Sequence, residues 1–250
     1  MRVLTVIPAR IGSSRLPEKP LRSIAGEPLV SLVAQRAVNL GVSTRIVVAA
    51  DDARVLEAVT HLAVDRVLTE PHHKSGTERI AEVLQRPEYA GIQCVLNLQV
   101  DQPFLPRDAA EGALRMVESG FAIGTAAAPL DPVHQSDRNI VKVAVGKADQ
   151  AERFARILTA IEMASGGDEF LHHLGVYAYT REAVLQWVGL PECVAEHTER
   201  LEQLRPMANG MSIGVASIDC VAPLAIDTEC DLQRAQCSQI HIKDQSRKSA

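Results

Sequence analysis

The sequence has few aromatic residues, short apolar runs and no closely spaced cysteine pair, and each shortage excludes a class of protein. Only 3% of the residues are Phe, Trp or Tyr, which leaves no platform on which nucleic-acid bases could stack. Apolar runs end after six or seven residues, whereas a membrane-spanning helix needs about 20. Five cysteines without a CxxC motif argue against both a disulfide framework and a zinc site. We therefore expect a protein of the reducing cytoplasm.

The charge and the apolar content are those of an ordinary globular domain. The formal net charge is −5, which excludes a broadly basic nucleic-acid binder but allows a local pocket for an anion. Hydrophobic residues make up 46% of the chain and charged residues 23%, enough to form a buried core. The opening segment MRVLTVIPAR has an apolar run too short for a signal peptide and is typical of a first strand. We expect an enzyme whose partners include neither nucleic acid nor a membrane.

Short apolar runs alternate with amphipathic patterns along the chain. The strands predicted from these runs span residues 3–8, 45–50, 64–68, 94–99, 140–145, 174–179 and 212–218. The predicted helices span residues 28–41, 75–84, 181–188 and 196–205, with a last one starting near 228. Helices between successive strands imply right-handed crossovers. The pattern predicts an α/β fold of Rossmann-like type with a mostly parallel, twisted sheet, in a single domain over residues 1–250.

The loop after the first predicted strand combines flexible turn residues with positive charge. In parallel sheets, ligands bind beyond the carboxyl ends of the strands. Backbone donors and spaced cations are what a polyphosphate needs, and this loop supplies them through Gly12, Ser13, Ser14, Arg10, Arg15 and Lys19. The loop has neither the GxxxxGK[ST] spacing of a Walker A motif nor the GxGxxG of a dinucleotide site. A solvated loop with incidental basic residues is the alternative interpretation.

The full string of this loop, PARIGSSRLPEKPL, resembles the signature of nucleotidyltransferases that activate sugar acids with CTP. The closest resemblance is to the CMP-Kdo synthetase (3-deoxy-manno-octulosonate cytidylyltransferase) family. Further segments are similar to motifs of that family in the same order: HKSGTER at 73–79, NLQVDQP at 97–103, HLGVYAY at 173–179, EHTERLEQLR at 196–205 and IDTECDL at 226–232. The resemblance therefore extends from residue 6 to residue 232, over nearly the whole chain.

This resemblance implies a nucleotidyltransferase fold and a specific reaction. An acceptor oxygen attacks the α-phosphorus of CTP, pyrophosphate leaves, and the acceptor becomes a CMP ester. Positioned cations and Mg²⁺ stabilise the charge that grows on the leaving group. The resemblance further implies a CTP-binding half at about 1–130 and an acceptor-binding and dimer-forming half at about 131–245, with a strand-rich segment that would form a homodimer.

The resemblance also assigns roles to individual residues. The catalytic set is Arg10, Arg15, Lys19, Asp101 and Asp227, and the last two would bind Mg²⁺ through hard carboxylate oxygens. The nucleotide-binding set is Pro8, Ala9, Arg10, Gly12, Ser13, Ser14, Arg15, Lys19, Asp51, Ser75, Gly76, Thr77, Arg79 and Gln99. Small residues at the start of the helix, Ser75 to Thr77, would expose backbone groups to the cytosine edge.

Simpler structural roles remain open for several of these residues. Asp227 precedes a predicted helix and could cap it, and Asp51 could cap the helix that follows the second strand. Asp101 could be an ordinary turn residue before Gln102 and Pro103. Ser75 or Thr77 could cap the predicted helix at 75–84 whether or not it contacts a base.

The acceptor-binding set implied by the resemblance is His73, Gln102, Arg156, His173, Tyr177, Glu202 and Gln203. Arg156 could bind a carboxylate or phosphonate through two hydrogen bonds, whereas Glu202 and Gln203 would suit sugar hydroxyls. The alternatives are a core histidine for His173, a core or dimer contact for Tyr177, and a helix-surface ion pair of Glu202 with Arg205.

Two positions of the 97–103 segment depart from the family motif, which has Gly and Glu where this sequence has Val100 and Gln102. The segment at 155–161 has also changed around Arg156, and the stretch from there to His173 is shorter than the resemblance suggests. Kdo or a Kdo-like sugar acid is the default acceptor. A carboxylated phosphonate such as phosphonoformate and a non-catalytic, nucleotide-binding paralogue are the alternatives.

Overall fold

The computed structural model describes residues 1–160, 162 and 170–237. The chain forms two compact units, which are described separately. The first, which we call the N-terminal unit, contains Leu4–Tyr89, Asn97–Leu105 and the chain from Pro223 on. The central unit contains Met1–Val3, Ala90–Leu96 and Pro106–Ala222. Among the described helices, none has the length and apolar character needed to span a membrane. A single domain over the whole chain stays a prediction.

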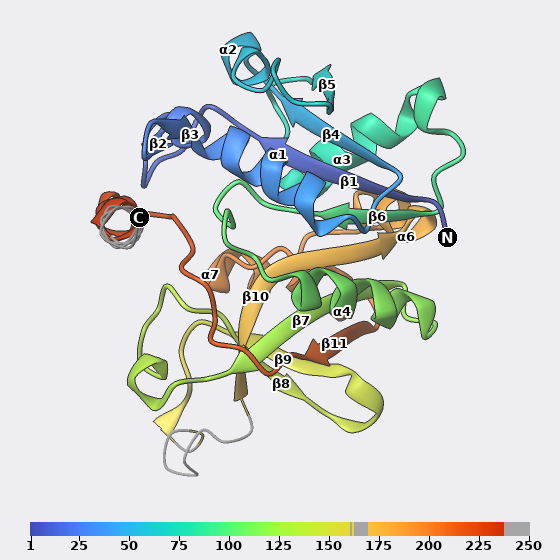
Figure 1. The fold of residues 1–250 in the computed structure, drawn as a ribbon. Coiled ribbons are helices and arrows are strands. Elements are labelled where there is room, and N and C mark those ends of the chain that lie inside the picture. Colours follow the sequence, from blue (N-terminus) through green and yellow to red (C-terminus); the bar gives the residue numbers. More distant parts are fainter. Residues whose placement is uncertain (161, 163–169, 238–250) are drawn as a thin grey trace. The chain divides into compact units, whose positions relative to one another are not determined.

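The N-terminal unit is built on three parallel strands in the order β1 (Val3–Ala9), β4 (Arg45–Ala50), β5 (Asp65–Leu68). Their β-branched and small apolar residues are buried on both faces, as parallel strands covered by helices require. Helices α1 (Leu29–Leu40), α2 (Ala53–Glu57) and α3 (Gly76–Gln85) all pack against β4 (Figure 1). Because β1 and β4 run parallel, the loops that follow them leave the same edge of the sheet.

A short helix and a hairpin connect β1 to α1. The 3-10 helix η1 (Lys19–Leu21) follows the loop after β1, and strands β2 (Ser23–Ile24) and β3 (Glu27–Pro28) form a hairpin behind it. The two hairpin turn residues, Ala25 and Gly26, both have positive φ angles, as a tight two-residue hairpin turn requires. Helix α1 ends at Gly41, whose φ of 64° gives it the left-handed conformation that closes helices.

The central unit has a mixed sheet in the order β11 (Ile213–Ser217), β7 (Ile123–Pro129), β10 (Phe170–Thr180), β6 (Cys94–Asn97). Strand β11 is parallel to β7, whereas β10 is antiparallel to β7. Strands β8 (Lys142–Val145) and β9 (Ala151–Ala155) extend this sheet from β10 in antiparallel pairs. Strands β8 and β10 correspond to the strands predicted at 140–145 and 174–179.

Helix α4 (Arg107–Glu118) packs against β7, β10 and β11 (Figure 1). Small residues at the contact allow a very close approach: a Cβ atom at Gly124 would lie 2.1 Å from the Ala113 carbonyl oxygen. Gly214 on β11 is similarly enclosed, because a Cβ atom there would meet Phe121 at 2.6 Å. The helix and the strands therefore fit together only because these positions have no side chain.

One predicted helix is wrong. The segment expected to form a single helix over 196–205 forms two short ones, α7 (Val194–Glu199) and α8 (Leu204–Ala208). The break falls at Arg200, whose φ of 54° lies in the left-handed region and ends α7. Arg205 on α8 reaches back across the break to Glu196 on α7 through two hydrogen bonds of 2.8 and 2.7 Å. Arg205 also lies 3.7 Å from Glu192 Oε1. The Glu202–Arg205 ion pair stays a prediction.

The α/β class is confirmed, with a sheet whose strand pairs are parallel in part and antiparallel in part. The other predicted strands and helices are found close to their expected bounds, including α6 (Arg181–Trp187) and a last helix at residues 229–237. Strand β6 ends at Asn97, two residues before the predicted end at residue 99. Helix α4 and strands β7 and β9 had no counterpart in the prediction.

Candidate active site

The N-terminal unit brings together four charged side chains from three segments that are far apart in the sequence. The Lys19 ammonium donates hydrogen bonds to Asp101 Oδ2 at 3.0 Å and to Asp227 Oδ1 at 2.9 Å. Arg15 Nη2 donates to the same Asp227 oxygen at 3.0 Å. These are four of the five residues predicted to be catalytic. The fifth, Arg10, lies exposed in the loop directly after β1.

Main-chain contacts place the two carboxylates beside each other. The N–H of Ile226 donates to the carbonyl oxygen of Asp101 at 2.9 Å, so the residue before Asp227 is bound directly to Asp101. Ile226 is fully buried and fixes this segment in the core. The helix at 229–237 is capped by Thr228, whose Oγ1 accepts from the N–H of Asp231. The Asp227 carboxylate is therefore directed at Lys19 and Arg15 instead of capping that helix.

The two carboxylates control the charge state of Lys19. Burial alone lowers the pKa of this lysine, but the negative charges of Asp101 and Asp227 outweigh it and raise the pKa above its usual value. Glu18, the residue before Lys19, has a φ of 52°, and its side chain makes no capping hydrogen bond to η1. Its carboxylate accepts a hydrogen bond from the Arg54 guanidinium at 2.9 Å. The ammonium is thus held in its charged form at a fixed place beside the loop.

A buried ion pair anchors the loop after β1. Asp51, directly after β4, accepts the N–H of Ile11 at 2.9 Å and pairs with Arg79 at 3.2 Å. Arg79 is buried and also donates to Thr69 Oγ1 and to the Glu70 carbonyl. The cap of α2 is Asp52, which accepts the N–H of Arg54. Asp51 therefore does not cap α2; it binds the loop to the sheet edge.

The start of α3 lies against the end of β1. Ser75 caps the helix by accepting the N–H of Glu78 at 3.2 Å, which decides the alternative between Ser75 and Thr77. A Cβ atom at Gly76 would lie 3.2 Å from the ring of Pro8, so the helix start and the strand end are in contact. His73 is bound by α3 through Glu82 Oε2 at 2.6 Å.

The two positions that depart from the family motif have ordinary surroundings. Val100 is buried and has no positive φ angle, so its side chain requires no backbone strain. Two side-chain oxygens next to it, Asp101 Oδ1 and Gln102 Oε1, are buried and have no hydrogen-bond partner among the described residues. Buried oxygens of this kind need a donor or a cation. The Gln99 carbonyl accepts the N–H of Gln102 at 3.0 Å and closes the turn.

Arg156, in the central unit, donates to main-chain carbonyls. Its guanidinium contacts the carbonyl oxygens of Glu199 at 2.9 Å, Arg138 at 3.2 Å and Arg200 at 3.4 Å. The ammonium of Lys142 is buried beside it and donates to the Arg156 carbonyl at 2.8 Å. Burial lowers the pKa of Lys142. In this arrangement, Arg156 ties the segment after β9 to the end of α7.

His173 is a buried side chain in the sheet of the central unit. Its Nε2 lies 2.9 Å from Thr125 Oγ1, and that hydroxyl donates its only proton to the carbonyl of Val176. His173 Nε2 must therefore carry a hydrogen and donate to Thr125. Burial lowers the pKa of His173 to about 3, so the ring is neutral.

The remaining acceptor-side residues differ in exposure. Tyr177 stacks on Tyr179 with ring centroids 5.8 Å apart, and its hydroxyl is buried with no partner among the described residues. Burial raises the pKa of Tyr177. Gln203 is buried, whereas Glu202 is exposed. The structure thus places these side chains in one unit but in different surroundings.

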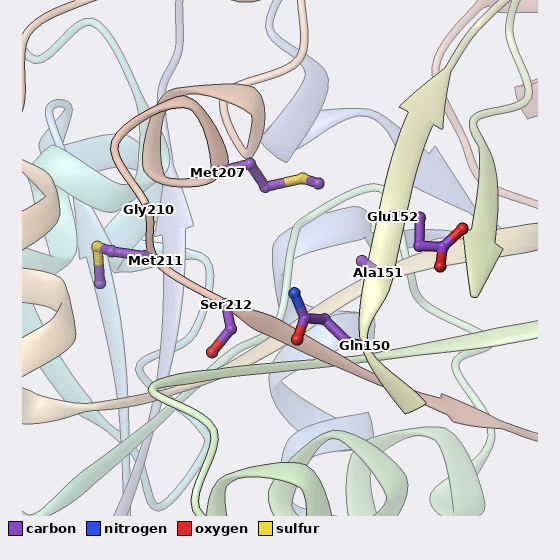
Figure 2. A pocket seen from close by; sticks show the side chains of 7 residues that line it. All are labelled: Gln150, Ala151, Glu152, Met207, Gly210, Met211 and Ser212. Atoms are coloured by element: carbon purple, nitrogen blue, oxygen red, sulfur yellow. The ribbon is translucent and has the colours of Figure 1, made fainter. Parts of the chain in front are cut away.

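The central unit also has an open depression of about 330 Å³. It lies between β9 and the segment that joins α8 to β11, and its lining includes Gln150, Met207 and Ser212 (Figure 2). No residue of the predicted sites lines it.

Some contacts of the predicted site involve residues that the sequence analysis did not single out. Glu18 and Arg54 fix the turn before Lys19, and Arg22 pairs with Glu229 at 2.8 Å. Asp231 accepts the N–H groups of Asp227 and Thr228. For Asp231 the sequence does contain a signal, because a threonine followed three residues later by an acidic residue resembles a capping box.

A family model described as cytidylyltransferase matches residues 4–213. The 3-deoxy-manno-octulosonate cytidylyltransferase of Gemmatimonas aurantiaca is 45% identical over 241 residues, with 94% of this chain and 93% of the relative covered. The protein of the same name from Methylococcus capsulatus is 40% identical, with 92% of this chain and 94% of the relative covered.

Solved structures agree with this match. A structure of CMP:2-keto-3-deoxy-manno-octonic acid synthetase complexed with CTP has a TM-score of 0.87 at 31% identity and covers 96% of this chain and 99% of that chain. A second structure, of a homologue from Mycobacterium sp. strain JC1, has a TM-score of 0.60 at 15% identity, which shows a shared fold alone.

Fold and sequence together define the class, so the chain is a cytidylyltransferase, as predicted. Within that class it belongs to the 3-deoxy-manno-octulosonate cytidylyltransferase (CMP-Kdo synthetase) family. The binding role of the basic loop after β1 stays a prediction.

The neutral, buried state of His173 predicts how stability depends on pH. Its pKa is about 3 in the folded chain and near 6.5 when unfolded, so below pH 6.5 the unfolded chain binds a proton that the folded chain does not. The free energy of unfolding should then fall by about 1.4 kcal/mol per pH unit as the pH decreases from 6.5.

Urea unfolding between pH 7.5 and 5 measures this effect. His173→Gln should have a shallower pH dependence than the unsubstituted protein, whereas His72→Gln, at an exposed position, should keep the full dependence. Equal slopes for the unsubstituted protein and His173→Gln would contradict the prediction.

Proposed function

We propose that this protein transfers CMP from CTP to Kdo and releases pyrophosphate, with Asp101, Asp227 and Lys19 at the reacting groups. The observation that carries the proposal is the convergence of both carboxylates on one ammonium, at 3.0 and 2.9 Å. The curated relatives are named for this reaction, and at 45% identity over most of both chains their substrates are the best guide to the acceptor.

The donor set favours a magnesium ion. Asp101 and Asp227 offer hard oxygen ligands, and the buried Asp101 Oδ1 has no hydrogen-bond partner among the described residues. Both carboxylates bind the same ammonium group, that of Lys19, so they lie close enough together to bind one cation between them. Mg²⁺ held there would polarise the α-phosphate and stabilise the attacking oxygen and the departing pyrophosphate.

The loop after β1 would bind the triphosphate. Arg15 and Lys19 are placed by Asp227, and Arg10 lies exposed at the end of β1. Asp51 and Arg79 would support this loop indirectly. Asp51, which pairs with Arg79, accepts the Ile11 N–H and so fixes the course of the loop. The backbone around Gly12, Ser13 and Ser14 would then present its N–H groups to phosphate oxygens.

The start of α3 would bind the cytosine. The contact between Gly76 and Pro8 brings the helix start to the end of β1. With its hydroxyl used as a cap, Ser75 leaves backbone groups of this turn to read the edge of the base. A pyrimidine fits a site walled by small residues better than a purine does.

For the acceptor, we assign Kdo and keep Gln102, His73, Gln203, Glu202 and Tyr177 as candidate contacts. Gln102 is supported by its buried oxygen next to Asp101. Arg156 and His173 are weaker candidates, because their polar atoms are bound to other groups of the protein.

The reaction itself is the first test. CTP with Kdo and Mg²⁺ should give CMP-Kdo and pyrophosphate with kcat/KM of ~10⁴ M⁻¹s⁻¹ or more. Phosphorus NMR would measure the formation of both products. ATP and GTP should bind more weakly than CTP in calorimetry. Turnover of phosphonoformate but not of Kdo would assign a different acceptor, and pyrophosphate release with neither acid would contradict the proposal.

The carboxylates give the second test. Asp101→Asn and Asp227→Asn should each lower kcat by roughly 10²-fold or more, since each removes an anionic ligand from the site of charge stabilisation. Asp131→Asn is the matched control, because Asp131 is an exposed residue that caps the short helix η3 (Pro132–His134). A loss of less than tenfold at saturating Mg²⁺ would show that the carboxylate is not a metal ligand.

We also propose a C2 homodimer in the cytoplasm, formed through the strand-rich segment of the central unit. The family resemblance implies this assembly, and strands β8 to β10 form a continuous antiparallel sheet in that segment. Light scattering at micromolar concentration should give about twice the chain mass of 27.1 kDa. A mass of one chain at every concentration tested would contradict this assembly.

A further inference from the structure

We propose that Asp231 is a positioning residue for Asp227, which holds its main chain so that the carboxylate meets Lys19 and Asp101. The inference rests on the role proposed above for Asp227. A single oxygen of Asp231, Oδ2, accepts the N–H of Asp227 at 3.2 Å, the N–H of Thr228 at 2.9 Å and the hydroxyl of Thr228 at 2.7 Å.

Helix capping explains only part of this arrangement. In a capping box, the first residue binds the N–H of the residue three positions on, whose side chain binds back to the first N–H. Thr228 and Asp231 make this exchange, with the Asp231 N–H donating to Thr228 Oγ1 at 3.3 Å. The additional bond from the Asp227 N–H reaches one residue beyond the helix and is not needed to cap it.

This additional bond fixes the main chain of Asp227 on the side of the last helix. On the other side, the Ile226 N–H donates to the Asp101 carbonyl at 2.9 Å. Consecutive N–H groups at 226 and 227 are therefore bound to Asp101 and Asp231, which leaves the Asp227 main chain little freedom to rotate. The helix that carries Asp231 is anchored in turn by Leu232 and Ala235, both buried.

A fixed main chain matters because the Asp227 side chain is short. With only two rotatable bonds, its carboxylate goes where the backbone directs it, here to within 2.9 Å of Lys19 and 3.0 Å of Arg15. Groups that orient the ligands of a metal typically contribute 10- to 100-fold to affinity or activity. Loss of Asp231 should release the Asp227 N–H and let the carboxylate move away from Asp101.

The test compares four proteins by Mn²⁺ binding in the presence of CTP, measured by electron paramagnetic resonance, and by kcat with Kdo. Asp231→Ala should weaken Mn²⁺ binding about tenfold and lower kcat at saturating metal by a similar factor. Asp231→Glu should stay within about threefold of the unsubstituted protein, because glutamate is the usual partner in a capping box.

Glu229→Gln is the matched control. It removes an acidic side chain from the first turn of the same helix, but Glu229 is exposed and pairs with the half-buried Arg22. We expect Mn²⁺ binding and kcat of this variant to equal those of the unsubstituted protein. A loss as large as that of Asp231→Ala would mean that negative charge at the helix start is responsible, and would overturn the positioning role.

Thermal unfolding separates positioning from stability. If Asp231→Ala lowers the melting temperature but the folded protein keeps its Mn²⁺ affinity and kcat, Asp231 is only a helix cap and the inference is wrong. If that variant does not fold, Asp231→Asn decides, with weaker Mn²⁺ binding supporting the inference and unchanged binding overturning it. Failure of the unsubstituted protein to convert CTP and Kdo would instead refute the proposed function, while the Mn²⁺ comparison would still judge Asp231.

Discussion

The bridge of Lys19 between Asp101 and Asp227 is the interaction on which the rest of the site depends. It joins three segments of the N-terminal unit: the loop after β1, the turn after β6 and the chain that enters the last helix. Two carboxylates this close repel each other unless a cation lies between them. A transfer reaction on a triphosphate also requires positive charge in fixed places. Cations bind the triphosphate and stabilise the negative charge that develops during the reaction.

Further contacts hold the segments that carry the three residues of the bridge. Asp51 and Arg79 hold the loop through Ile11, and Glu18 with Arg54 fixes the turn that precedes Lys19. At the other end, main-chain bonds through Ile226 and Asp231 set the course of the chain around Asp227. Asp51 and Asp231 accept backbone N–H groups, whereas Glu18 and Arg54 bind each other through their side chains.

Much of this could be predicted from the sequence, and the failures have physical reasons. Strands with β-branched runs, such as β4, and a helix with a serine cap, such as α3, carry local signals. Strand β7 was missed because its IGTAAAP segment has small residues in place of β-branched ones, a choice that α4 requires for close packing. The break at Arg200 was missed because no glycine marks its left-handed conformation. The closeness of Asp101 and Asp227 came from the family resemblance alone, since a separation of 126 positions in the sequence contains no signal of proximity.

A crystal structure of the protein with CTP and Mn²⁺, located by anomalous scattering, would test the central claim most directly. The account predicts a metal peak about 2.1 Å from a carboxylate oxygen of both Asp101 and Asp227, with the triphosphate on the loop after β1. A CTP molecule bound there with its metal on other ligands, and with both carboxylates still bound to Lys19, would contradict it.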